Sequence, residues 1–351
     1  MEFHTKVNVP ASDPIPALGV TWCGCQTHER MLTVTVDPNI PDRALLLPAA
    51  EALLAGGLVA FPTETVYGLG ALALDPDAAG RIFDVKGRPA DDPLIVHVRP
   101  HWNLGGIFAE VNATISDLAR LHWPGPLTIV AAKHPSVPDV VTAGRSTVAV
   151  RAPSHPVAML LLDMVGVPVA APSANRFSYV SPTSAVHVAA DLGDRIDVLV
   201  DAGPTPIGIE STIVLVEGER LSILRPGSIQ LEGVEADLSA PASHAPGRRD
   251  LHYSPNTPTR AIEAGGRLPP DTRPGTLVGF DDSEPVPPGW RFVSLGNRDD
   301  LATVAQRLYE MLREVDRTEP DWMVVEFTGQ GGLGEAVDDR IRRAAGGQTV
   351  Y

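Results

Sequence analysis

Several short stretches of the chain combine cations, hydroxyl groups and glycines in a way that suits a small anionic ligand. The first is the run 62–70, PTETVYGLG. If this run is extended, Thr63, Thr65 and Tyr67 share one face, because side chains alternate along a strand. Two hydroxyls and a phenol could bind a small polar ligand there, but a turn rich in threonine and glycine is more often structural.

A pair of cations follows in the run 86–89, KGRP. Lys86 and Arg88 flank a glycine at the end of a predicted helix, and Asp92 and His97 come shortly afterwards. Such cations suit a triphosphate, which arginine can grip through two nitrogens at once. The same cations would also stabilise the negative end of the helix. The residues alone leave both interpretations open.

The other polar clusters lie where predicted strands end. In the run 147–151, Thr147 and Arg151 point to one face, and an arginine in this position commonly pairs with a carboxylate of a ligand or of the protein. Together the clusters place a lysine, several arginines and several hydroxyls at strand ends, where α/β sheets bind ligands. Further polar turns occur at 171–175 (APSAN), 181–183 (SPT), 208–212 (GIEST) and 224–227 (LRPG).

Familiar catalytic motifs are missing from the sequence. It contains no GxxxxGK[ST] phosphate loop, no HExxH zinc pair and no GxSxG nucleophile elbow. The glycines at 331–334 form no dinucleotide fingerprint and are interpreted as a turn into the last helix. Cys23, Cys25 and His28 have no partner pair downstream, so they indicate a metal site only weakly. We therefore predict no protein-held metal.

The hydrophobic pattern indicates which elements position these clusters. Short apolar runs alternate with helical patterns, and this mix favours a twisted α/β sheet over a helical bundle. Helices are predicted at 45–54 and 78–86, each ended by glycine. Strands are predicted at 58–61, 94–98, 127–132, 147–151, 167–171, 198–200, 211–216 and 221–224.

Composition limits the class of protein. The chain has 351 residues, is 44% hydrophobic and carries a net charge of −15, from 43 acidic and 28 basic residues. This acidity argues against tight nucleic-acid binding across the whole surface, because such binding neutralises phosphates with Lys and Arg. No apolar run approaches the ~20 residues that span a bilayer, and the N-terminus does not resemble a signal peptide. With only two cysteines, a reducing, cytoplasmic location is expected.

The chain divides into regions of different character. We expect a poorly ordered leader over 1–30, a catalytic domain over 31–231, a linker over 232–258 and a smaller Rossmann-like α/β domain over 259–351. The linker is rich in Ser, Ala, Pro and Gly in place of periodic apolar residues. The last region carries an amphipathic helical pattern at 301–315 and predicted strands at 259–263, 276–280, 292–295 and 323–327.

The order and residue sequences of the clusters resemble those of the YrdC/Sua5 family of threonylcarbamoyl-AMP synthases. The resemblance covers about residues 40–230 and rests on FPTETVYGLG, KGRP, PLIVH, WPGPLT, TVAVRAPSHP, APSAN, SPT, GIESTIV and LRPG. Near the C-terminus, HYSP and GLGEAVDDRIRRAA resemble the linker and the last helix of the longer, Sua5-type members. The resemblance implies a YrdC-like mixed sheet with a positively lined cavity, followed by a Sua5-type C-terminal domain.

The resemblance also implies a reaction. The enzyme would join bicarbonate or CO2 to the amine of L-threonine and attach the product to AMP from ATP, with release of pyrophosphate. Mg²⁺ would arrive with ATP, not in a protein site. A separate transferase complex would then pass the threonylcarbamoyl group to adenosine 37 of tRNA. The chain would thus be a nucleotidyltransferase in tRNA processing that itself binds no nucleic acid strongly and no membrane.

Matching motif positions assigns ligands to residues. Lys86 and Arg88 are the implied catalytic residues. The implied ATP-binding residues are Lys86, Arg88, Asp92, Thr147, Ser173, Asn175, Ser181, Arg225 and Tyr253. The implied threonine-binding residues are Thr65, His97, Arg151, Ala171 and Ser211.

Two departures and two alternatives remain open. The family usually has Asn at the position of Asp92, and a carboxylate there would repel phosphate. Its linker usually reads close to SPGMKYRHYAP, whereas this chain has APGRRDLHYSP. One alternative is a paralogue that forms a carbamoyl-adenylate on another amine or serves a carbamoyltransferase pathway. The other is a non-catalytic RNA-binding module, against which the acidic charge argues.

Overall fold

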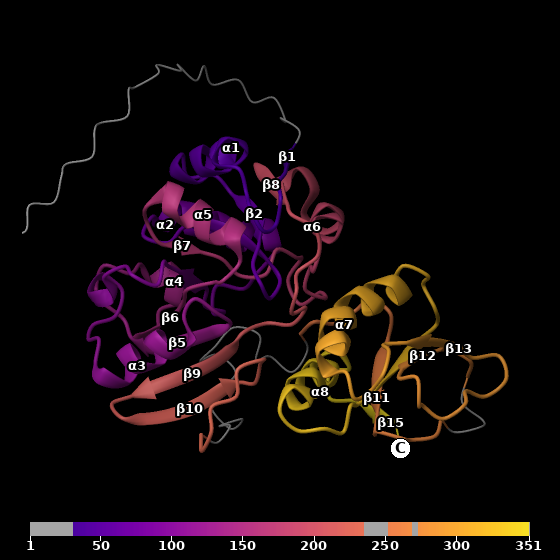
Figure 1. The fold of residues 1–351 in the computed structure, drawn as a ribbon. Coiled ribbons are helices and arrows are strands. Elements are labelled where there is room, and N and C mark those ends of the chain that lie inside the picture. Colours follow the sequence, from indigo (N-terminus) through magenta and orange to yellow (C-terminus); the bar gives the residue numbers. More distant parts are fainter. Residues whose placement is uncertain (1–30, 235–251, 269–272, 351) are drawn as a thin grey trace, which may run out of the picture.

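Two β-sheets organise the chain in the computed structural model, which describes residues 31–234, 252–268 and 273–350 (Figure 1). We call 31–234 the large-sheet unit, the described part of 259–350 the small-sheet unit, and 252–258 the connecting segment. The predicted leader, with its two cysteines and His28, lies outside the described residues, as does most of the predicted linker.

The large-sheet unit is built on a mixed sheet of ten strands, which agrees with the mixed sheet that the resemblance implies. Its order is β1-β8-β2-β3-β7-β4-β6-β5-β9-β10, with parallel pairs such as β4–β6 beside antiparallel pairs such as β5–β6. The predicted alternation of strands and helices is therefore confirmed. The strands are β1 Leu32–Thr35, β2 Val59–Pro62, β3 Tyr67–Leu72, β4 Ile95–His97, β5 Leu127–Ala132, β6 Thr147–Arg151, β7 Val169–Ala170, β8 Val198–Asp201, β9 Thr212–Glu217 and β10 Arg220–Arg225.

Helices cover both faces of this sheet. Apolar side chains of α1 and α5 form one core with the sheet, and those of α2, α3, α4 and α6 form another on the opposite face. Local signals fix the ends of α2, because Asp75 caps its first amides and Gly87 ends it in the left-handed conformation, with φ 64°. The helices are α1 Arg43–Leu54, α2 Pro76–Lys86, α3 Ala113–His122, α4 Asp139–Thr142, α5 Pro156–Val165 and α6 Ala185–Leu192, with 3-10 turns η1 Leu104–Gly106 and η2 Gly193–Arg195.

The small-sheet unit has five strands in the order β13-β12-β14-β11-β15, and every pairing is parallel. Parallel strands joined by helices agree with the predicted Rossmann-like character. The elements are β11 Thr259–Ile262, β12 Thr276–Gly279, β13 Arg291–Ser294, α7 Leu301–Asp316, β14 Met323–Glu326, α8 Leu333–Ala344 and β15 Thr349–Val350. Among the described residues, no helix has the length and apolar character needed to cross a membrane.

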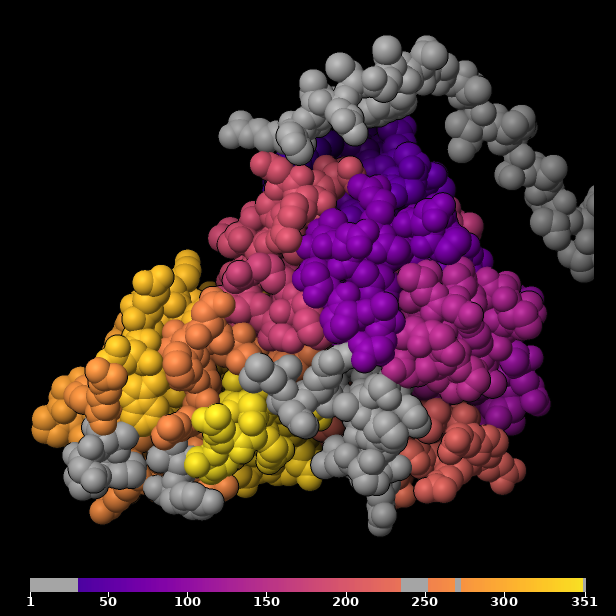
Figure 2. All heavy atoms as spheres, turned by 180° about the vertical axis from the view of Figure 1, so that it is seen from behind, coloured from indigo at the N-terminus to yellow at the C-terminus, as the bar shows by residue number. Residues whose placement is uncertain are grey.

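The two units are packed against each other through α7 and α8, which lie between the two sheets (Figure 1). Figure 2 shows the same contact from behind, where orange and yellow atoms of the small-sheet unit meet pink atoms of the large-sheet unit. At Gly208, with φ 84°, an added Cβ would lie 2.4 Å from the Cα atom of Gln306 in α7. Glycine is therefore required there, both for its conformation and for the close approach of the helix.

Candidate active site

The first cluster of the candidate site surrounds Lys86 at the end of α2. Its ammonium donates to the carbonyl oxygens of Ser173 and Asn175, at 2.5 Å each, and so ties α2 to the turn after β7. Burial, and secondarily the charge of Arg88, holds the pKa of Lys86 well below its usual value. Lys86 thus faces the APSAN turn and is almost fully buried.

Arg88 is also buried and forms an ion pair with Asp92, with Nη2 3.1 Å from Oδ1. The guanidinium further donates to the carbonyls of Asp92 and Pro93, at 3.0 and 2.7 Å. Asp92 is therefore placed beside the predicted phosphate-binding arginine, where it neutralises part of its charge. The ion pair offsets the repulsion expected between the Asp92 carboxylate and phosphate, because the carboxylate has a cation partner within the protein.

The second cluster lies at the ends of β4 and β6. His97 and Arg151 are neighbours in the parallel register of these strands. The Arg151 guanidinium donates to the Thr65 hydroxyl at 2.9 Å, and its Nη2 lies 2.6 Å from Oε1 of Glu64. Burial, reinforced by Arg151, lowers the pKa of His97 to about 3, so its imidazole is neutral near pH 7.

The run 62–70 reaches this cluster by a turn and not by strand alternation. The Thr63 hydroxyl donates to the carbonyl of Val66 at 2.7 Å, and Thr65 lies against it with the two hydroxyl oxygens 2.8 Å apart. Such side chain–backbone bonds compete with an extended chain. The expectation that Tyr67 shares this face is wrong, because its hydroxyl donates to the carbonyl of Gly203 at 2.7 Å.

The third cluster joins β9, β10 and the connecting segment. Arg225, at the end of β10, donates to the carbonyl oxygen of Ser211 at 2.9 Å and to its hydroxyl at 3.1 Å. The same guanidinium contacts the Tyr253 hydroxyl at 3.4 Å. The Ser211 hydroxyl also lies 2.8 Å from that of Thr128. Ser211 is thus oriented by two strands and by an arginine that also touches the connecting segment.

The connecting segment closes over these clusters. His252 and Tyr253 are buried, with ring centroids 4.1 Å apart, and Tyr253 packs at 5.6 Å against Tyr309 of α7. Tyr253 has φ 59°, a left-handed conformation that is uncommon for a residue with a Cβ and is often found at functional sites. Burial, followed by nearby cations such as Arg88, holds the pKa of His252 well below its usual value.

The three clusters line one cavity of about 50 Å³. It brings together the predicted Thr65, Arg88, His97, Arg151, Ala171, Ser173, Ser211, Arg225 and Tyr253. Lys86, Asp92, Asn175 and Ser181 are buried behind this lining. Thr147 does not line the cavity and lies at the opposite end of β6 from Arg151.

Two titratable lining residues, Glu210 and His252, were not assigned a role from the sequence, and neither was Glu64, which pairs with the lining residue Arg151. Each lies inside a motif that the sequence made conspicuous, next to an assigned residue: Thr65, Ser211 and Tyr253. A carboxylate next to hydroxyl residues, as in PTET and GIEST, was the available signal. That signal did not reveal the ion pairs of Glu64 and Glu210, because their partners, Arg151 and Arg340, are distant in sequence.

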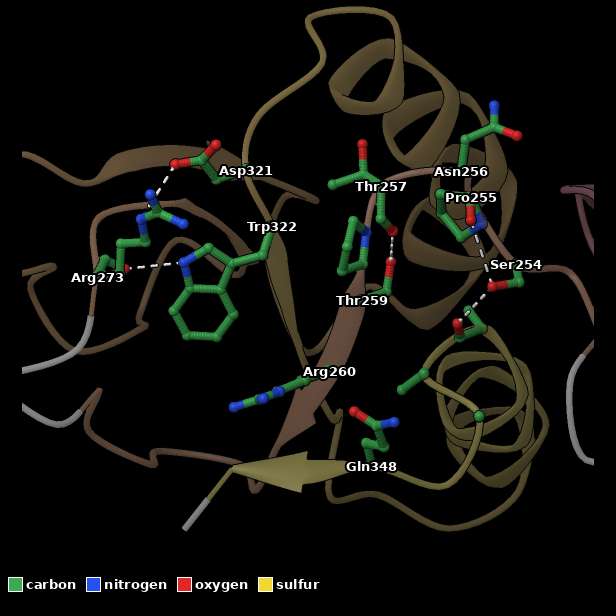
Figure 3. A pocket seen from close by; sticks show the side chains of 14 residues that line it. Ser254, Pro255, Asn256, Thr257, Thr259, Arg260, Arg273, Asp321, Trp322 and Gln348 are labelled. Carbon is green, nitrogen blue, oxygen red and sulfur yellow. Dashed lines mark hydrogen bonds and ion pairs between the residues drawn. The ribbon is translucent and has the colours of Figure 1, made fainter.

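A larger cavity, of about 830 Å³, lies in the small-sheet unit (Figure 3). Trp322 and Arg260 flank it, with the guanidinium 5.4 Å from the ring centroid, and the indole nitrogen donates to the carbonyl of Arg273 at 2.8 Å. It is lined by Ser254 and Pro255 of the HYSP motif and by Ala344 and Ala345 near the end of α8, but by none of the residues assigned to a substrate. Of these two cavities, only the smaller one is lined by several buried arginines together with buried hydroxyl side chains.

Two family models match the chain. A family model named Sua5_yciO_yrdC, described as "Telomere recombination", matches residues 51–227. A second, described as "Threonylcarbamoyl-AMP synthase, C-terminal domain", matches residues 219–346.

Two curated relatives match most of the chain. The threonylcarbamoyl-AMP synthase of Pyrococcus abyssi is 40% identical over 86% of this chain and 94% of its own length. The threonylcarbamoyl-AMP synthase of Bacillus subtilis is 38% identical over 90% of this chain and 95% of its own length. A crystal structure of P. abyssi Sua5 complexed with L-threonine aligns with a TM-score of 0.82, at 35% identity, over 92% of this chain and all of that one. The chain therefore belongs to the Sua5/YciO/YrdC family, in its long form with a Sua5-type C-terminal region.

Proposed function

We propose that this chain is an L-threonylcarbamoyl-AMP synthase that supplies the threonylcarbamoyl group for the modification of adenosine 37 in tRNA. In the first step the amine nitrogen of threonine bonds to the carbon of bicarbonate, and water and a proton leave. In the second, an oxygen of the new carbamate bonds to the α-phosphorus of ATP, and the bond to pyrophosphate breaks. The observation that carries the proposal is one cavity lined by Arg88, Arg151 and Arg225 together with hydroxyls.

The threonine side of the cavity is assigned to Thr65, His97, Arg151, Ala171 and Ser211. A guanidinium has five N–H donors. The contacts of Arg151 with Gly125, Thr65 and Glu64 leave donors for a ligand carboxylate. Because His97 is neutral, it adds no second positive charge beside the substrate amine, which must lose its proton to react. A P. abyssi relative crystallised with L-threonine supports this choice of amino acid.

The ATP side is assigned to Lys86, Arg88, Ser173, Asn175, Ser181, Arg225 and Tyr253, with Asp92 acting on Arg88 and Thr147 a weaker candidate. In this assignment Lys86 and Arg88 neutralise charge that develops on the leaving pyrophosphate. Chemistry of this kind needs positioning and preorganised charge more than a covalent nucleophile. Lys86 would also fix the turn that carries Ser173 and Asn175, through the two carbonyls it contacts.

The small volume of the cavity indicates that it opens to bind its substrates. Pockets for small-molecule ligands usually measure about 300–1,000 Å³, far more than the cavity volume of about 50 Å³ in this structure. His252 and Tyr253 are the lining residues that come from the connecting segment and not from the large sheet. We infer that this segment withdraws to admit ATP and closes again, which would keep water from a hydrolysable adenylate.

The same proposal includes the metal ion, the enzyme complex that uses the product and the location in the cell. We expect Mg²⁺ to enter bound to the phosphates of ATP, since no group of three or more His, Cys, Asp or Glu side chains suited to a metal occurs within the described ranges. A transferase complex acting on tRNA would use the product, and the cytoplasm is the expected location. The domain boundaries at 31–231, 232–258 and 259–351 remain part of this proposal.

The experiment is pyrophosphate release by the purified chain with ATP and bicarbonate, screened across amino acids. Threonine should support the fastest release, and serine, which lacks only a methyl group, should be slower by roughly 10-fold or more. Fastest release with another amine would favour the alternative of a paralogue with a different acceptor. Release that needs no amino acid would contradict the proposal.

A further inference from the structure

Arg340, in α8 of the small-sheet unit, is a fully buried arginine whose main partner belongs to the large-sheet unit. Its Nε donates to Oε2 of Glu210 at 2.8 Å, and its Nη1 donates to Asp339 at 2.8 Å. Glu210 lines the cavity and directly precedes Ser211. The guanidinium of Arg340, from the small-sheet unit, therefore contacts the residue that directly precedes Ser211 of the proposed threonine site.

The Glu210 carboxylate joins three elements at once. Besides the bond from Arg340, it accepts from the Ser181 hydroxyl at 2.6 Å and from the Tyr309 hydroxyl of α7 at 2.8 Å. Ser181 is one of the residues assigned to ATP. A shift of Glu210 would thus displace groups on both substrate sides of the cavity.

Arg340 also contacts Tyr253 of the connecting segment. Its guanidinium lies 5.6 Å from the ring centroid of Tyr253, within the range of a cation–π contact. The hydroxyl of the same ring meets Arg225. Burial alone would raise the pKa of Glu210, but Arg340 and then Arg225 outweigh it and hold that pKa below its usual value. The carboxylate is therefore ionised, and it needs its cations.

We propose that Arg340 is a positioning residue of the catalytic site, supplied by the small-sheet unit, which holds Glu210 so that Ser181, Ser211 and Tyr253 face the substrates. This role rests on the proposed function. It gives the C-terminal region a part in the reaction itself, beyond covering the cavity. Gly208, which lets α7 approach the chain two residues before Glu210, belongs to the same contact.

The test compares full-length variants at a temperature well below the melting temperature of each. Arg340→Met should lower kcat/KM roughly 100-fold, as expected for displacement of reacting groups by about an ångström. Arg340→Lys, which keeps the charge but not the planar fork, should recover part of that loss. The control is Arg342→Met on the same helix, whose guanidinium packs on Phe327 at 5.2 Å; its kcat/KM should stay within about 2-fold.

A double-mutant cycle separates positioning from general stability. Arg340→Met leaves a buried carboxylate without its main cation, so that variant can fail to fold. Glu210→Gln with Arg340→Met removes the charge problem, and its activity should be no lower than that of the worse single variant. The KM values for ATP and threonine and the kcat are measured for each folded variant.

The outcomes are distinct. Folded variants with altered KM or kcat and non-additive losses support the role. Variants that only melt earlier, while their folded fraction turns over like the wild type, overturn it. A wild-type chain that releases no pyrophosphate with any amino acid overturns the proposed function, and the positioning role falls with it.

Discussion

The Nη2 atom of Arg151 lies 2.6 Å from Oε1 of Glu64, and both side chains are buried. The cation assigned to the carboxylate of threonine therefore already has an anion within the protein. Glu64 fixes the guanidinium in place and reduces its net charge, so threonine would bind to an oriented fork of donors and not to an isolated charge.

Arg151→Ala should raise the KM for threonine much more than the KM for ATP, because it removes the partner of the carboxylate. The same change leaves Glu64 buried without its cation, so stability should fall by about 3–5 kcal/mol. Steady-state kinetics and urea unfolding measure the two effects. The control is Arg120→Ala, which breaks an exposed pair with Asp117 and should change neither. A larger effect on ATP than on threonine would reverse the assignment of the two sides.

Replacing Lys86 or Arg88 with Ala should cost roughly 2–4 kcal/mol of transition-state stabilisation, as for the loss of other preorganised charge donors. Pyrophosphate release by each folded variant gives this value. Lys133→Ala is a matched control, because that lysine pairs with the exposed Asp139 away from the cavity. Near-wild-type rates for both variants would show that these cations do not serve the phosphates.

Stability should fall in mild acid through His97. Its folded pKa of about 3 is below the ordinary value near 6.5, so between these values the unfolded chain binds a proton that the folded chain does not. Unfolding free energy is therefore lost as pH drops from about 6.5, by about 2 kcal/mol at about pH 5 for this group alone.

His97→Gln removes that titration. The buried His252 and the partly buried His187 have pKa values shifted in the same direction, so the informative quantity is the difference between wild type and variant. The acid-induced loss of stability, measured by chemical unfolding at about pH 7.5 and pH 5, should be smaller in the variant. Equal losses in both proteins would mean that His97 is not buried in the neutral form.

Tyr253→Ala should weaken ATP binding and reduce accumulation of the adenylate, because it removes the ring that closes the cavity. Tyr253→Phe keeps the ring and loses only the hydroxyl contact with Arg225 at 3.4 Å, so it should retain most activity. Calorimetric ATP affinity and product accumulation distinguish the two variants. If Tyr253→Ala binds ATP and accumulates product like the wild type, the segment merely packs the two units together.

Much of the fold could be predicted from the sequence because local patterns control it. The predicted strands at 127–132 and 147–151 coincide with β5 and β6, and the stop at Gly87 is a left-handed helix cap. The helix α5 was missed because its residues, PVAMLLLDMV, are apolar on nearly every side, and periodicity alone does not distinguish a helix from a strand in a short apolar run.

The site was predictable to the extent that its residues fall in contiguous motifs. The residues nearest the cavity, such as Arg151 and Ser211, lie at strand ends, as the sheet pattern predicts. The bond between Glu210 and Arg340 joins residues 130 positions apart, and no local pattern reports such a pair. The turn at Thr63 was also hidden, because a hydroxyl that bonds nearby backbone can replace the extended conformation that the sequence favours.

The measurement that tests the central claim most directly is mass spectrometry of the product formed from ATP, isotopically labelled bicarbonate and L-threonine. We predict an adenylate that contains threonine and the labelled carbon, together with an equal amount of pyrophosphate. It should not form when threonine or ATP is left out. An adenylate without the labelled carbon, or ATP consumption that yields no threonine-containing nucleotide, would contradict the proposed function.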